Sequence, residues 1–281
     1  MGNIIDYVKE YGDKAFSDMA FNEVDGLVLS QFAYFKWENV IPELSENAVG
    51  ITLNEMAEKM QEAEVFSYER YARDNRLLWD AMLGSKRYGN IRCNYLSSSL
   101  RKDVEVQFCA FVATPPDALP VVLFRGTDET ILGWKEDYNM SFDTPMAGHR
   151  LASLYLKQVV LRIEGDFVIA GHSKGGNLAV FSALDNDDTI RKRIFKIYDY
   201  DGPHFRQEII EERDFPGIRE KIHKLIPESS VVGIMLETEH LYEIVKSRAF
   251  GGVSQHYPYT WIAEGCKFKR ANKLDRTSLR L

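Results

Sequence analysis

The chain has 281 residues, of which 45% are apolar and 27% are charged, a balance that excludes disordered, collagen-like and disulfide-scaffold proteins. The length allows either two small domains or one large α/β domain with an additional cap. Its 35 basic and 42 acidic residues give a net charge of −7, which makes nucleic acid or an anionic membrane an unfavourable partner.

The first part of the chain is predicted to be mainly helical. Thr52 and Glu55 have the spacing of a capping box, in which each residue bonds the backbone N–H of the other at the start of a helix. We expect residues 1–90 to form a helical cap that covers the carboxyl edge of a sheet and shapes an acyl pocket. Its aromatic side chains are expected to pack in a core, with a contribution to a lid or to the acyl pocket as the alternative. Helices are predicted over residues 25–37, 54–64 and 69–83.

The remainder, residues 91–281, alternates between strand and helix patterns and is predicted to form the core domain. Strands separated by helices indicate βαβ units and a mainly parallel sheet, flanked by helices. Strands are predicted over residues 104–112, 119–124, 167–170, 195–200 and 222–226, and helices over residues 146–164 and 178–184. The basic run near the carboxyl end, residues 267–273, is predicted to be a solvated tail.

The most informative motif is Gly171-His172-Ser173-Lys174-Gly175, which lies between a short apolar strand and a helix. This is the setting of a nucleophile elbow, a sharp turn that holds a serine at the carboxyl edge of a parallel sheet. The turn is tight, so the residues two before and two after the serine must be small, and both are glycine. Ser173 is therefore the candidate nucleophile, and the backbone N–H of Lys174 is a candidate oxyanion contact.

A serine nucleophile needs a base, and a histidine base needs an acid to orient it. In α/β-hydrolases these residues follow the serine in the order acid and then histidine, which favours His256 as the base. Asp201 ends a predicted strand and keeps that order, although an aspartate before Gly-Pro is also a common turn former. Glu228, Glu237 and Glu239 remain alternative acids.

Three ordered motifs resemble those of class 3, or fungal-type, lipases. Residues 124–127 read Phe-Arg-Gly-Thr and are followed by Trp134 and Asp137, and residues 171–176 match the Gly-His-Ser-x-Gly-Gly pattern. His256, with a tryptophan five residues later, is similar to the histidine segment of the same group. The resemblance covers residues 104–265 and is closest to a bacterial branch with a helical N-terminal extension.

This resemblance implies an α/β-hydrolase fold and assigns Thr127 as the second oxyanion contact. It also implies an acid after the strand over residues 222–226, where this chain has Ser230 near the expected position. That departure is the reason for favouring Asp201, and it also motivates a non-catalytic reading.

Cysteine usage and the N-terminus predict a cytoplasmic protein. Cys93, Cys109 and Cys266 are far apart and form no CxxC pattern, which is typical of reduced thiols. The first residues lack the basic and apolar regions of a signal peptide. No segment approaches the ~18 apolar residues of a membrane span, so we expect no stable membrane insertion.

The sequence therefore predicts a serine hydrolase that cleaves carboxylic esters, with Ser173, His256 and Asp201 as its triad. We expect a small-molecule or lipid ester, such as an acylglycerol, as the substrate. Two alternatives remain: a non-catalytic relative that binds a lipid or a partner, and a thioesterase or peptidase that uses the same triad. No nucleotide-binding or zinc motif is present, so we expect no cofactor and no metal.

Overall fold

A computed structural model describes residues 2–60, 65–66, 71–101, 106–127, 147–213, 215–237 and 241–275. Trp134, Asp137 and Glu239 lie outside the described residues. Within the described ranges, none of the helices combines the length and the apolar character that a membrane span requires.

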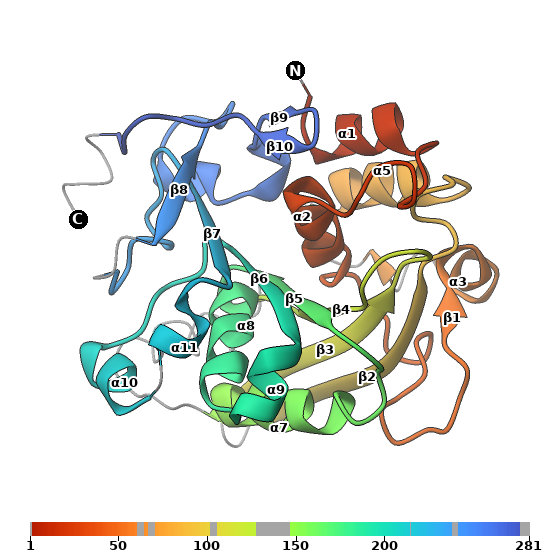
Figure 1. The fold of residues 1–281 in the computed structure, drawn as a ribbon. Coiled ribbons are helices and arrows are strands. Elements are labelled where there is room, and N and C mark those ends of the chain that lie inside the picture. The colour runs from red at the N-terminus through yellow and green to blue at the C-terminus, as the bar shows by residue number, and fades with distance from the viewer. Residues whose placement is uncertain are drawn as a thin grey trace.

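The centre of the molecule is an eight-stranded sheet whose strands lie in the order of the chain (Figure 1). Strands β1 to β4 pair antiparallel, and strands β4 to β8 pair parallel. The parallel half therefore brings the carboxyl ends of β4 to β8 to one edge. The strands are β1 (Ile51–Thr52), β2 (Arg92–Arg101), β3 (Val106–Thr114), β4 (Val121–Phe124), β5 (Phe167–His172), β6 (Ile194–Tyr200), β7 (Ile222–Pro227) and β8 (Tyr242–Val245).

Helices cover both faces of this sheet because its strands are apolar on both sides. In β4, Val122 and Phe124 join one hydrophobic cluster, and Val121 and Leu123 join the other, since successive side chains of a strand point to opposite faces. The first face is covered by α7 (Ala147–Val159), α8 (Lys174–Leu184) and α9 (Asp188–Arg193). The second is covered by α1 (Ile4–Tyr11), α2 (Glu23–Phe32) and α5 (Ala72–Met82) (Figure 1).

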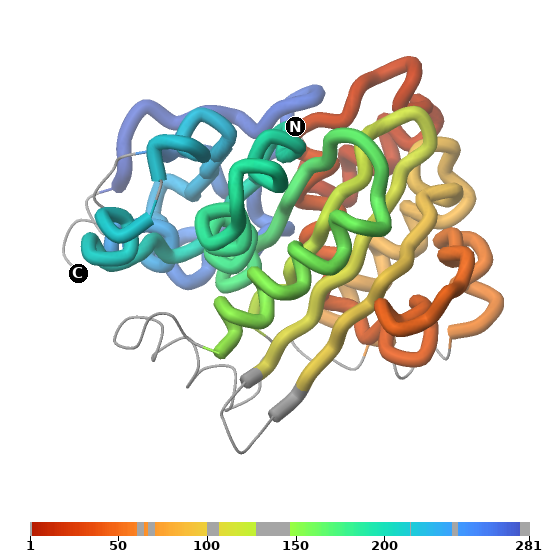
Figure 2. Tube along the Cα trace, turned by 60° about the horizontal axis from the view of Figure 1, so that its bottom comes forward, coloured from red at the N-terminus to blue at the C-terminus, as the bar shows by residue number. Residues whose placement is uncertain are grey.

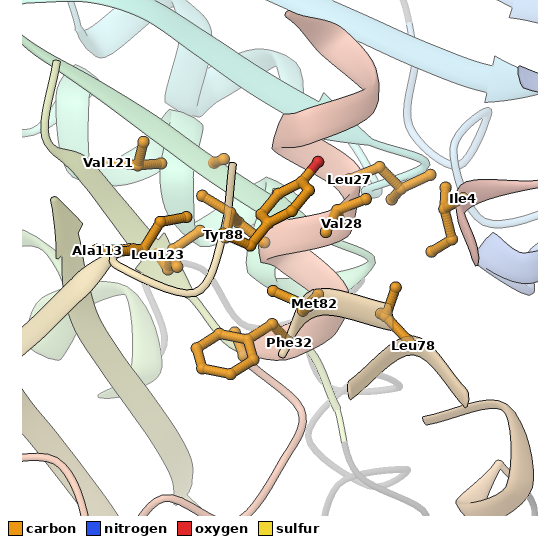
Figure 3. Close-up of a cluster of buried hydrophobic side chains, with 14 of the residues drawn as sticks. Ile4, Leu27, Val28, Phe32, Leu78, Met82, Tyr88, Ala113, Val121 and Leu123 are labelled. Carbon is orange, nitrogen blue, oxygen red and sulfur yellow. The ribbon is translucent and has the colours of Figure 1, made fainter. Parts of the chain in front are cut away.

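The N-terminal helices thus lie against a face of the sheet, whereas the sequence predicts a cap over its carboxyl edge. Figure 3 shows the contact: apolar side chains of α1, α2 and α5 meet those of β3 and β4, including Leu27, Val28, Leu78, Ala113 and Leu123. The reason is hydrophobic burial, because these strand residues need a cover on that face. The predicted division of the chain at residue 90 stays a prediction.

Helix α2 begins earlier than predicted because Asn22 caps it. The Asn22 side chain accepts hydrogen bonds from Val24 N and Asp25 N, and the Asp25 carboxylate accepts one from Asn22 N. The predicted capping box of Thr52 and Glu55 is also present, at the start of α3 (Leu53–Lys59).

Strand β2 and the short strand β8 were not among the predicted strands. The β2 sequence carries arginine, asparagine and three consecutive serines, so it lacks the apolar run that marked the other strands. It pairs antiparallel with β1 and β3, and Figure 2 shows β2 and β3 as two long yellow strands side by side next to α7. The smaller elements are α10 (Gln207–Glu212), α11 (Pro216–Arg219), α12 (Gly252–Gln255), the 3₁₀ helix η2 (Pro258–Thr260), β9 (Ala263–Glu264) and β10 (Lys267–Phe268).

The basic run near the C-terminus is not a solvated tail over its described residues. Phe268 is buried, and Arg270 donates hydrogen bonds of 2.7 and 2.8 Å to the buried carboxylate of Glu23. Phe268 N donates to the same carboxylate at 2.7 Å. The run is therefore paired with the first residue of α2, a contact between distant segments that charge alone did not predict.

A fully buried ion pair fixes the N-terminal helices. Asp25 of α2 accepts hydrogen bonds from Arg87 Nε at 2.8 Å and Nη2 at 2.5 Å, and neither side chain is exposed. The hydroxyls of Tyr88 and Tyr7 also donate to Asp25, at 2.6 and 3.2 Å. A buried charge is tolerated when it is paired and hydrogen-bonded in this way.

Replacing Asp25 with alanine should lower the free energy of unfolding by about 3–5 kcal/mol, because the Arg87 guanidinium would stay buried without its carboxylate. Urea denaturation measures the change. Asp18→Ala is the matched control, since the Asp18–Lys86 pair is largely exposed and should contribute little. Equal effects of the two substitutions would contradict a structural role for the buried pair.

Candidate active site

Ser173 lies in a sharp turn between β5 and α8, at the carboxyl edge of the sheet. Its backbone has φ 58° and ψ −131°, a conformation that residues other than glycine adopt rarely. Ser173 N donates a 2.9 Å hydrogen bond to the carbonyl of Tyr200, so the neighbouring strand β6 supports the turn. Strained backbone of this kind, held by its surroundings, is typical of functional sites.

The turn closes because residues 171 and 175 are both glycine. A Cβ on Gly171 would overlap the carbonyl of Gly175, and a Cβ on Gly175 would overlap the carbonyl of Phe124 in β4. The backbones of β4, β5 and α8 therefore approach more closely than any side chain would allow. This is the steric requirement on which the sequence motif depends.

Asp201 follows β6, the strand beside β5, and is completely buried. Its Oδ2 lies 2.6 Å from His256 Nδ1. Its Oδ1 accepts hydrogen bonds from Ser230 Oγ at 2.5 Å and from Gly233 N at 3.1 Å. Both carboxylate oxygens are thus satisfied, and one of them faces the imidazole.

Ser230, which stands near the position where the lipase resemblance implies the acid, donates to Asp201. The hydroxyl thereby orients the carboxylate that contacts His256, and this contact gives a physical account of the departure from the family pattern. Nothing in the spacing of the sequence indicated it.

His256 follows α12 directly and is about one fifth exposed, with a side-chain exposure of 22%. Its ring centroid lies 4.6 Å from that of His172, the residue before Ser173. His172 Nε2 donates a 2.9 Å hydrogen bond to the His256 carbonyl. The loop that carries His256 and the turn that carries Ser173 are therefore in direct contact.

Among the described residues, Asp201 is the carboxylate hydrogen-bonded to His256. Glu228 accepts a hydrogen bond from Lys246 at 2.7 Å, and Glu237 accepts one from the buried Lys224 at 2.8 Å. Glu239, the remaining alternative acid, lies outside the described residues.

Both candidate oxyanion residues lie at the same edge as Ser173. Thr127 comes three residues after β4, whose last residue Phe124 pairs with Gly171 of β5. Lys174 is the first residue of α8, and its buried side chain extends away to donate a 2.9 Å hydrogen bond from Nζ to the carbonyl of Gln107. The Lys174 ammonium is thus held at β3.

The other described histidines have different partners. Burial lowers the pKa of both His149 and His204 to about 4, so both rings are neutral at pH 7. His149 Nε2 bonds Asn177 Oδ1 at 2.7 Å, and His223 Nε2 bonds Glu23 at 2.9 Å. These contacts place the His149 and His223 rings in the packing of the fold.

Asp199, two residues before Asp201, is buried at the end of β6 and accepts a 2.9 Å hydrogen bond from Gly202 N. Burial raises the pKa of Asp199 to about 7, with the Lys224 ammonium opposing that shift.

A family model described as Mbeg1-like matches residues 82–281. Among solved structures, the chain is similar to a fungal lipase–inhibitor complex, with 14% identity, 80% of this chain and 78% of that chain covered, and a TM-score of 0.45. It is also similar to M37 lipase, with 13% sequence identity and a TM-score of 0.42, and the match covers 75% of this chain and 68% of that chain. No curated protein matches the chain.

The mainly parallel sheet, the helices on both of its faces and the serine turn between β5 and α8 confirm the expected α/β-hydrolase fold. With its match over residues 82–281, the chain belongs to the Mbeg1-like family.

Proposed function

We propose that the protein is a serine hydrolase that cleaves carboxylic esters through an acyl-enzyme on Ser173. The observation that carries the proposal is the 2.6 Å hydrogen bond between His256 and the buried Asp201, beside the strained serine turn. An ordered acid, imidazole and hydroxyl at one sheet edge are the groups that acyl transfer requires.

The hydrogen bond to Asp201 determines which ring nitrogen of His256 carries the proton. Nδ1–H donates to the carboxylate, so Nε2 of the neutral ring carries the lone pair that a base needs. Asp201 also stabilises the imidazolium that forms when Nε2 is protonated. Its two further donors, Ser230 and Gly233, keep the carboxylate in that orientation.

In the proposed reaction, His256 Nε2 removes the proton of Ser173 Oγ as Oγ bonds to the acyl carbon. The same proton passes to the alkoxide oxygen when the ester C–O bond breaks, which leaves an acyl-serine. Water then adds to the acyl carbon with its proton transferred to Nε2, and cleavage of the bond to Oγ releases the carboxylic acid and restores the hydroxyl.

We assign the backbone N–H of Lys174 and Thr127 as the hydrogen-bond donors to the negatively charged oxygen of the tetrahedral intermediate. The N-terminus of α8 carries partial positive charge, which stabilises an oxyanion at this edge. Since the Lys174 side chain bonds the Gln107 carbonyl, its backbone is the part assigned to the substrate.

The same geometry bears on the non-catalytic alternative. That hypothesis depends on the absence of an acid at the position of Ser230. Asp201, which follows β6, supplies a carboxylate that contacts His256. We therefore favour an enzyme over a binding relative. The same triad serves thioester cleavage as well, and a comparison of ester and acyl-CoA substrates distinguishes the two reactions.

The enzyme should react with a fluorophosphonate probe, because the probe's phosphorus is attacked by an activated serine. Wild-type protein should be labelled, and Ser173→Ala should not, as read by gel fluorescence and intact mass. Ser254→Ala, which changes a serine of α12 two residues before His256, is the control and should remain labelled. Absence of wild-type labelling would favour the non-catalytic reading.

Replacing Asp201 with asparagine should reduce turnover of p-nitrophenyl butyrate by about 10⁴-fold, because an amide N–H would hold His256 in the wrong tautomer. Glu228→Gln is the matched control, since the Glu228 carboxylate is hydrogen-bonded to Lys246, and it should retain nearly full turnover. A large loss in Glu228→Gln together with an active Asp201→Asn would reassign the acid.

Carboxylic esters should be hydrolysed faster than matched acyl-CoA or amide substrates. Measurement of kcat/KM for p-nitrophenyl esters of two to twelve carbons, with acyl-CoA and anilide analogues, tests the substrate class. A preference for acyl-CoA would make the protein a thioesterase.

A further inference from the structure

Tyr34, in the turn that follows α2, reaches the serine turn from the N-terminal part of the chain. Its hydroxyl lies 2.9 Å from His172 Nδ1 and, at a longer distance of 3.3 Å, from the His172 carbonyl oxygen. The centroids of the Tyr34 and His172 rings lie 5.9 Å apart. The N-terminal segment therefore contacts the residue immediately before the proposed nucleophile.

The two ring nitrogens of His172 have different partners, and these partners define its tautomer. The His256 carbonyl accepts hydrogen bonds but cannot donate, so His172 Nε2 carries the proton of that 2.9 Å bond. Nδ1 of the neutral ring is then an acceptor, and the Tyr34 hydroxyl donates to it. A continuous chain of hydrogen bonds thus runs from Tyr34 through His172 to the backbone of His256.

His172 is buried, and this burial is the main reason why its pKa lies well below its usual range. The neighbouring His256 lowers the pKa of His172 further. A neutral His172 suits the proposed mechanism, because the His256 ring 4.6 Å away becomes positively charged during the reaction. A second imidazolium at that distance would oppose this charge.

The position of the Tyr34 hydroxyl depends on Gly126, the third residue of the Phe-Arg-Gly-Thr motif. A Cβ at residue 126 would overlap the Tyr34 hydroxyl and would come within 2.6 Å of the His172 carbonyl. The tyrosine is therefore fitted between the motif that carries Thr127 and the turn that carries Ser173.

The N-terminal segment also holds the residues that follow His256. Tyr257 donates a 2.8 Å hydrogen bond to Asp74, and Tyr259 donates one of 2.7 Å to Asn75, both at the start of α5. The ring of Tyr257 stacks on that of Tyr71 at 3.9 Å. Residues 1–90 thus hold the chain directly after His256 through α5, and they reach the His256 carbonyl indirectly, through Tyr34 and His172.

We propose that Tyr34 is a positioning residue for the base, acting through His172 on the backbone and ring of His256. The inference rests on the proposed function. Tyr34 is hydrogen-bonded to His172, the residue before the proposed nucleophile. Its role is to fix the tautomer of His172, so that Nε2–H keeps the His256 carbonyl, and with it the ring, beside Ser173.

Tyr34→Phe tests this role because it removes one hydroxyl and preserves the ring. Turnover of p-nitrophenyl butyrate should fall about tenfold in kcat, the effect of losing roughly one hydrogen bond, while KM stays within twofold. Tyr95→Phe is the matched control, since its hydroxyl makes a 3.5 Å contact with the Arg162 carbonyl, and it should leave both constants unchanged. Each kcat is calculated per reactive Ser173, whose concentration is measured by titration with a fluorophosphonate.

A pair of His172 variants separates positioning from general stability. His172→Gln can place an amide N–H near the His256 carbonyl and should retain most of the kcat, whereas His172→Phe fills a similar volume without a donor and should lose about tenfold or more. Thermal unfolding of each variant records stability independently of kcat.

The outcomes distinguish the two proposals. If wild-type protein is labelled at Ser173 but Tyr34→Phe matches Tyr95→Phe in kcat, positioning by Tyr34 is wrong and the hydrolase proposal stands. An effect on KM alone, or equal losses in His172→Gln and His172→Phe, also overturns positioning. If wild-type protein neither reacts with the probe nor turns over the ester, both proposals fail.

Discussion

The hydrogen bond between Asp201 and His256 joins two segments that are 55 residues apart, and the rest of the candidate site depends on it. Asp201 is fully buried, and a buried carboxylate is tolerated when donors satisfy it. His256, Ser230 and Gly233 provide those donors. Withdrawal of the histidine would leave one oxygen without its donor, so the carboxylate holds the His256 loop against the sheet.

The same edge contains two residues with unusual backbone geometry, and the sheet stabilises both. Ser173 and Asp201 follow the neighbouring strands β5 and β6, with φ of 58° and 54°. Ser173 N donates to the Tyr200 carbonyl, and Asp201 N donates to the Leu225 carbonyl, at 2.9 and 2.8 Å. Each strained residue is thus bonded to the next strand, and the parallel register fixes the spacing between the proposed nucleophile and the carboxylate.

Local features of this site were predictable from the sequence, and long-range ones were not. The serine turn could be predicted because two glycines, a preceding strand and a following helix are adjacent in the chain. The pairing of Asp201 with His256 could be predicted only from the chain order of serine, acid and histidine, because an aspartate before Gly-Pro is also a common turn former. The donation from Ser230 and the contact of Tyr34 with His172, 138 residues away, leave no periodic pattern that sequence analysis could detect.

The N-terminal segment is bound to the sheet more extensively than a movable cap would require. One hydrophobic cluster contains Leu27 and Val28 of α2 together with Val121, Leu123 and Ala170 of the sheet. Without this segment, an apolar face of the parallel strands would be exposed to water. The family match begins at residue 82, yet Tyr34 lies before it and contacts His172. The segment that buries this face therefore also supplies the hydroxyl that reaches the serine turn, so the packing of α2 and the order of the His256 loop are coupled through one tyrosine.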